Sequence, residues 1–202
     1  MSQQLVLICC AVLLLADPLV VNTSSGFVRG FANGTHHVYR GIPYARAPIG
    51  DLRWRPPVEA VPWKGVRDAT HFNATCSQPP GGVTPPGQPP PGYWNSLNIT
   101  VTSEDCLFVN VYTPAHMKSN STFPVMVYIH AGEFWVGSSN DLENDWAPAP
   151  DVILVTFNFR VGAFGFMGGE MLRNRSSDGS TGNYGMQDQR YNLYASYRIL
   201  CC

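Results

Sequence analysis

The sequence predicts an α/β fold in which a buried sheet is covered on both sides. Two nearly continuous apolar runs, at 125–129 and 152–157, are typical of strands that are buried on both faces. Residues 186–200 are compatible with a helix that begins near Asp188. Buried strands of the parallel type, combined with a helix, indicate this fold class.

Composition limits the classes of partner. The chain has 202 residues, within the range of a single domain, and a formal net charge of −1. Charged residues make up 13%, about half the usual share. Since there is no basic run and no acidic tail, we expect no nucleic-acid partner and no electrostatic attraction to a membrane.

The N-terminus has the pattern of a targeting segment. Residues 5–15 form an apolar run that suits a signal peptide and is too short to span a bilayer. Cleavage after Ala16 fits this pattern, so we expect a signal peptide over residues 1–16, one domain over 17–202 and no transmembrane helix. A buried strand or a short membrane anchor is the alternative.

Six glycosylation sequons agree with a secreted, extracellular protein. They begin at Asn22, Asn33, Asn73, Asn98, Asn120 and Asn174.

The cysteines fit an oxidising compartment. Two of the six lie in the expected signal peptide and two end the chain, which leaves Cys76 and Cys106 as the natural pair. A disulfide that closes a loop of about 30 residues would stabilise the fold by about 3.5 kcal/mol. Because there is no CxxC and no paired histidine spacing, we expect no metal site and no cofactor.

Turn chemistry predicts an N-terminal hairpin. Residues 19–31 and 36–40 have the composition of short strands, and Asn33-Gly34 between them is a hairpin signal. Residues 41–66 carry Pro, Gly and Trp without periodicity and predict an irregular segment.

Two further segments complete the predicted order of elements. Apolar and polar residues alternate sufficiently over 107–112 to predict a strand, which Pro114 ends. Residues 179–185 predict a loop before the helix.

A set of motifs in a characteristic order supports a family assignment. The motifs are 41–45 (Gly-Ile-Pro-Tyr-Ala), 52–54 (Leu-Arg-Trp), 56–57 (Pro-Pro), 103–114, 125–137, 158–166 and 182–189. Together they resemble the type-B carboxylesterases and cholinesterases of the α/β-hydrolase superfamily. The resemblance spans about residues 18–190. It implies the N-terminal part of an α/β-hydrolase fold, with a mixed central sheet and a short N-terminal β-hairpin, truncated before the nucleophile elbow.

The resemblance also implies two structural pairs. Cys76 and Cys106 would form the family's first disulfide, and Arg53 would pair with Glu104. The alternative for Arg53 and Glu104 is two unrelated surface charges.

The catalytic residues of the superfamily are not found in this chain. They follow the order Ser, acid, His, with the serine in a G-x-S-x-G elbow, and no such motif occurs here. The five histidines (His36, His37, His71, His116 and His130) all precede the place where the elbow would come. We therefore expect the chain to be inactive as it stands, and expect His130 to hold the neighbouring loop structurally.

The loop after residue 129 corresponds to the oxyanion loop of the family. The usual run is of the His-Gly-Gly-Gly-Phe type, whereas this chain has His130-Ala-Gly-Glu-Phe134. By position, Gly132 and Glu133 would supply N–H donors. A carboxylate about 5 Å from a forming oxyanion would repel it by about 3 kcal/mol, comparable to the roughly 2.7–4 kcal/mol that one donor contributes. The alternative is a harmless variant loop.

Two tryptophans are candidates for the substrate gorge. Trp94 lies in the disulfide loop, where cholinesterases place a cation-binding Trp, although the spacing differs by two residues. Ordinary packing is the alternative for Trp94. We expect Trp135 to line the gorge or to pack at its rim.

Three hypotheses on function follow. The chain is part of a secreted serine ester hydrolase, or a non-catalytic cholinesterase-like interaction protein with a protein partner, like the neuroligins, or a non-functional product. Ester substrates are expected only if a further segment supplies the catalytic residues. In the family's sheet the strand at 125–129 lies beside the strand that leads to the nucleophile, so here we expect an unpaired apolar edge.

Overall fold

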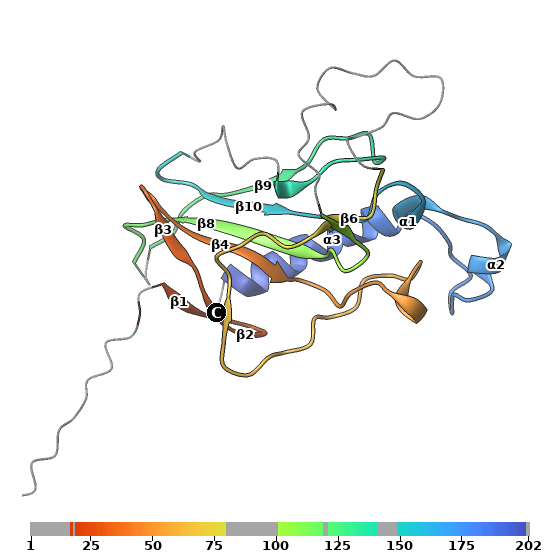
Figure 1. The fold of residues 1–202 in the computed structure, drawn as a ribbon, viewed down its shortest axis with the longest axis horizontal. Coiled ribbons are helices and arrows are strands. Elements are labelled where there is room, and N and C mark those ends of the chain that lie inside the picture. Colours follow the sequence, from red (N-terminus) through yellow and green to blue (C-terminus); the bar gives the residue numbers. More distant parts are fainter. Residues whose placement is uncertain (1–16, 18, 80–100, 119–120, 141–148, 201–202) are drawn as a thin grey trace, which may run out of the picture.

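The centre of the molecule is a mixed five-stranded sheet (Figure 1). The computed structural model describes residue 17 and residues 19–79, 101–118, 121–140 and 149–200. Its strand order is β3-β4-β8-β10-β9, and only the β9–β10 pair is parallel. The strands are β3 (Phe31–Asn33), β4 (His36–Pro43), β8 (Phe108–Pro114), β9 (Val125–Ile129) and β10 (Ile153–Phe157).

Smaller elements surround this sheet. One sheet joins β1 (Val20–Thr23), β2 (Gly26–Arg29) and β5 (Val66–Asp68), and another joins β6 (Thr75–Cys76) and β7 (Thr102–Ser103). The helices are the 3₁₀ turn Gly50–Leu52, α1 (Gly162–Phe166), α2 (Glu170–Arg173) and α3 (Tyr184–Leu200). None of the helices in the described ranges has the length and apolar content that a membrane crossing requires.

Helix α3 lies along one face of the central sheet (Figure 1). Val109, Val155 and Phe157 project from β8 and β10 into the apolar core, against which Tyr191 and Ala195 of α3 pack. Every residue of β8 and β10 is buried, so these strands are covered on both faces. The α/β class and the mixed sheet are therefore confirmed.

The strand at 125–129 is present, but the prediction that both its faces are buried is wrong. β9 is the edge strand of the described sheet, and three of its five residues are exposed. Its inner edge pairs with β10 from Ile153↔Val125 to Phe157↔Ile129. Because an edge strand has a neighbour on one side only, an apolar run does not by itself ensure burial on both faces.

The single strand predicted at 19–31 is wrong, because it is divided into β1, β2 and β3. A turn separates β1 from β2, in which the Thr23 hydroxyl donates to the Gly26 carbonyl at 2.7 Å and accepts from the Ser25 N–H at 3.3 Å. The β3–β4 hairpin around Asn33-Gly34 is confirmed.

Helix α3 begins earlier than predicted, at Tyr184 rather than near Asp188. Asp188 does not cap the helix: its carboxylate is fully buried against Arg160, which follows β10. The guanidinium donates from Nε to Oδ2 at 2.8 Å and from Nη2 to Oδ1 at 2.7 Å, and the Arg160 N–H donates to Oδ2 at 3.1 Å. Burial raises the pKa of the Asp188 carboxyl, while the Arg160 guanidinium opposes that rise.

The buried pair predicts a specific pattern of stabilities. Asp188→Leu leaves the Arg160 charge buried without its partner, so we expect it to lower the free energy of unfolding by about 3–5 kcal/mol. The double variant Arg160→Met/Asp188→Leu removes both charges, so it should recover most of this loss. The check is urea denaturation of both variants and the wild type.

The matched control is Arg53→Met. Arg53 pairs with Glu104 where both side chains are partly exposed, so its loss should cost about 0–1 kcal/mol. Equal losses for Asp188→Leu and Arg53→Met would contradict the structural role of the buried pair.

Candidate oxyanion site

The segment after β9 forms a tight turn. The N–H groups of Trp135 and Val136 both donate to the Gly132 carbonyl, at 2.8 and 3.1 Å. Gly132 has φ +135°, and a Cβ there would lie 1.8 Å from the Val136 carbonyl oxygen. Only glycine therefore fits at this position.

This turn leaves two backbone donors available. Within the described ranges, the N–H groups of Gly132 and Glu133 have no hydrogen-bond acceptor. They are consecutive, and two residues separate them from the end of β9 in the central sheet. Adjacent backbone N–H groups that are already fixed in place can stabilise an oxyanion without further reorganisation.

Glu133 adopts a backbone conformation that favours glycine. Its φ is +53°, and that of Phe134 is +63°. For residues with a side chain this left-handed conformation costs about 1–2 kcal/mol each. The strain falls on the position at which the family resemblance leads us to expect a glycine.

Glu133 is one of the residues that line an open hollow of about 370 Å³. Its walls come from the turn and from the region of α1, and they comprise Glu133, Phe134, Trp135, Gly162, Ala163, Phe166 and Met167. The Phe134 and Phe166 rings contact each other with centroids 5.2 Å apart. The hollow thus adjoins Glu133, one of the two residues whose N–H groups have no acceptor among the described residues.

His130 is buried at the base of the turn and cannot easily carry charge. Its ring stacks on Phe159 at 4.1 Å, and its Nδ1 lies 3.0 Å from the Ala131 carbonyl oxygen. Burial lowers the pKa of His130 from 6.5 to about 4, with the Ala131 carbonyl acting weakly in the opposite direction. These contacts fit the structural role expected for this residue.

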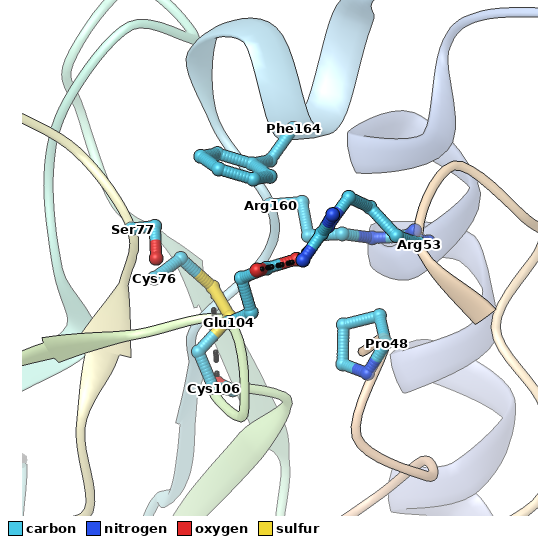
Figure 2. A pocket seen from close by; sticks show the side chains of 8 residues that line it. All are labelled: Pro48, Arg53, Cys76, Ser77, Glu104, Cys106, Arg160 and Phe164. Atoms are coloured by element: carbon cyan, nitrogen blue, oxygen red, sulfur yellow. Dashed lines mark hydrogen bonds and ion pairs between the residues drawn. A yellow bond between two sulfur atoms is a disulfide. The ribbon is translucent and has the colours of Figure 1, made fainter. Parts of the chain in front are cut away.

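The disulfide and the predicted ion pair meet at one small cavity (Figure 2). Cys76 and Cys106 are bonded, with their Cα atoms 4.8 Å apart. Arg53 and Glu104 form a bidentate pair, with Nε–Oε2 and Nη2–Oε1 distances of 2.5 Å. The cavity between them measures about 10 Å³, which leaves no space for a substrate.

The other predicted positions lie in different places. Trp135 is partly exposed and lines both the Glu133 hollow and a second one of about 320 Å³ near Gln78. Trp94, Asn98 and Asn120 lie outside the described residues. Asn22, Asn33 and Asn174 are exposed, whereas the exposed Asn73 uses its side-chain N–H to donate to the Gly41 carbonyl at 2.9 Å.

Sequence reasoning missed two residues that hold the turn. Asn158, at the end of β10, accepts from the Ser139 N–H at 2.8 Å. Gln78 forms hydrogen bonds to both backbone groups of Gly137. The Gln78–Gly137 contact spans 59 residues, so no local pattern indicates it.

The buried His130 predicts a pH dependence of stability. Between pH 6.5 and about 4 the unfolded chain takes up a proton at this residue and the folded chain does not. The contribution of neutral His130 to the free energy of unfolding is therefore complete above pH 6.5. It should decline by about 3 kcal/mol as the pH falls to 4. His130→Phe should remove this part of the slope in urea denaturation. The control is His71→Phe, at an exposed histidine, which should leave the pH dependence of the free energy of unfolding unchanged. Equal pH dependences for wild type and His130→Phe would show that His130 is not the group responsible.

Comparison with known proteins shows which family the chain resembles. Residues 17–194 match the sequence profile of the Carboxylesterase family. The chain is 36% identical over 179 residues to the cAMP-regulated D2 protein of Dictyostelium discoideum, covering 86% of this chain and 29% of that protein. It is 37% identical over 185 residues to carboxylesterase 1D of Rattus norvegicus, covering 86% and 31%.

A solved structure shows the same fold. A PNB esterase aligns with a TM-score of 0.73 and 32% identity, covering 91% of this chain and 36% of the esterase. The chain thus spans about three-tenths of the length of these curated relatives. The match extends from the N-terminal hairpin through the turn at 132–137 to α3, and the chain belongs to the carboxylesterase family.

Proposed function

We propose that this chain is the part of a carboxylic ester hydrolase that supplies the oxyanion hole. The observation that carries the proposal is the turn after β9, which holds the N–H groups of Gly132 and Glu133 side by side, with no acceptor among the described residues. Ester hydrolysis passes through a tetrahedral oxyanion, and fixed backbone donors lower its energy. The ester substrates of the named relatives are consistent with this chemistry.

The rest of the catalytic machinery is proposed to come from outside these residues. The 202 residues contain no G-x-S-x-G motif, and the buried His130 is held by Phe159 and Ala131 rather than by a nucleophile. We therefore propose that the chain alone does not hydrolyse esters.

A second candidate function is a cholinesterase-like interaction protein without catalysis, which binds a protein partner as the neuroligins do. Glu133 favours this candidate, because it brings an acidic residue and backbone strain to one of the two N–H donors of the proposed oxyanion hole. A binding protein has no oxyanion to stabilise, so such a loop would not impair it. A G-x-S-x-G elbow in a longer form would favour the enzyme over this alternative.

We also propose that the protein enters the secretory pathway. The apolar run at 5–15 has the pattern of a signal peptide. The disulfide between the buried Cys76 and Cys106, and the exposed sequons at Asn22, Asn33 and Asn174, support an oxidising compartment. Mass spectrometry of protein secreted by a eukaryotic host, with the N-terminal residue and the glycans identified, tests this proposal.

The role of the Glu133 carboxylate is testable in a chimera that joins residues 17–194 to the catalytic portion of a PNB esterase. Glu133→Gly removes both the charge and the side-chain strain, so we expect kcat for an ester to rise by tenfold or more, since the repulsion is about 3 kcal/mol. Stopped-time assays of kcat and KM measure the effect.

Glu133→Gln is the matched variant, because it removes the charge and retains the Cβ. It should give most of the gain in kcat if charge is the cause, and little of it if strain is the cause. Equal rates for the parent chimera and for its Glu133→Gln and Glu133→Gly variants would show that the carboxylate has no influence on the oxyanion.

A further inference from the structure

One side-chain amide holds both backbone groups of the residue that ends the oxyanion turn. The Gly137 N–H donates to Gln78 Oε1 at 2.7 Å, and Gln78 Nε2 donates to the Gly137 carbonyl at 2.8 Å. The second hydrogen of Nε2 is directed to the Cys76 carbonyl at 3.0 Å. The amide therefore bonds the turn on one side and the disulfide-bearing strand on the other.

The position of Gly137 constrains the start of the turn through close packing. Its φ is +118°, and a Cβ there would lie 2.2 Å from the Ala131 carbonyl oxygen and 2.4 Å from His130 Nδ1. Residue 137 is thus packed directly against 130–131. Since the N–H of Val136 donates to the Gly132 carbonyl, a shift of Gly137 would move the segment that carries the N–H groups of Gly132 and Glu133.

Gln78 is attached to a segment that is itself fixed by a disulfide and a buried hydrogen bond. Cys76 is buried and bonded to Cys106, which is also buried. Next to it, the Thr75 and Ser138 hydroxyls lie 2.9 Å apart in a buried contact. The anchor of the turn is therefore a crosslinked segment rather than a free loop.

We propose that Gln78 is a positioning residue for the oxyanion turn, through which the Cys76–Cys106 segment fixes the N–H groups of Gly132 and Glu133. Its effect on turn geometry is independent of catalysis, whereas its effect on rate rests on the proposed function. The role requires an amide, because the side chain must accept from one backbone group and donate to another. The carboxylate of a glutamate at this position could only accept hydrogen bonds. The thioether of a methionine, which has a similar length, has no N–H or O–H donor and only a weak acceptor.

The first test is hydrogen–deuterium exchange of the 202-residue protein, resolved at the amides of Trp135, Val136 and Gly137. We expect these amides to exchange about tenfold faster or more in Gln78→Met than in wild type, because two hydrogen bonds to the turn are lost. Gln78→Glu should lie between the two. Gln187→Met is the matched control, since Gln187 donates one bond to Gly182, at 3.2 Å, and should leave the three amides unchanged.

Two results would overturn the proposal. One is unchanged exchange at the three turn amides in Gln78→Met. The other is an equal acceleration at the buried β10 amides of Val155 and Phe157, which would show that Gln78 supports only global stability. If Gln78→Met does not fold, the comparison of Gln78→Glu with wild type decides by the same criteria.

The second test uses the esterase chimera. Gln78→Met should lower kcat about tenfold or more with KM unchanged, because a displaced turn weakens contacts that form only in the transition state. A change in KM alone would overturn the positioning role. If the chimera with native Gln78 is inactive, the proposed function fails, and the exchange experiment still decides the role of Gln78.

Discussion

The buried contact between Arg160 and Asp188 fixes the platform on which the oxyanion turn rests. Arg160 follows β10, and its guanidinium, held in a bidentate pair, ties that segment to α3. From the same segment, the Gly162 N–H donates to the Phe134 carbonyl at 2.7 Å. Asn158, two residues before Arg160, holds the Ser139 N–H at the far end of the turn. Residues 158–162 therefore bind the chain within the turn, at Phe134, and two residues beyond its end, at Ser139, and the ion pair orients them.

The oxyanion turn contains two glycines that its close packing requires and one glutamate in a backbone conformation that disfavours a side chain. Gly132 and Gly137 occupy positions where a Cβ would meet backbone atoms. Glu133 lies between them in the left-handed region, which glycine adopts freely and glutamate does not. Gly132 and Gly137 thus hold a tight turn that carries two adjacent backbone N–H groups, while Glu133 brings strain and an acidic side chain to its centre. This contrast is the reason why an enzyme and a binding protein are both reasonable functions for the family member described here.

Local patterns predicted the elements but not their long-range contacts. Asn33-Gly34 predicted the β3–β4 hairpin, because an N-G pair favours the required turn. The apolar run at 152–157 predicted a buried strand, whereas the similar run at 125–129 is an edge strand, a position that the family resemblance indicated and the run itself did not, since burial depends on neighbouring strands. Gln78 and the partner of Asp188 were not predicted, because their contacts span 59 and 28 residues and, unlike Cys76–Cys106 and Arg53–Glu104, neither the cysteine count nor the family resemblance indicated them. The positive φ of Glu133 likewise follows from the closed turn and not from the residue itself.

In the proposed oxyanion hole, Gly132 and Glu133 direct their N–H groups at one oxyanion. The most direct measurement is a crystal structure of the esterase chimera with a trifluoromethyl ketone, which forms a tetrahedral adduct with the catalytic serine. We expect the adduct oxygen to lie about 2.7–3.1 Å from both backbone nitrogens, as an oxyanion hole requires. An adduct oxygen beyond hydrogen-bond distance of both nitrogens, with the Glu133 carboxylate in its place, would contradict this claim.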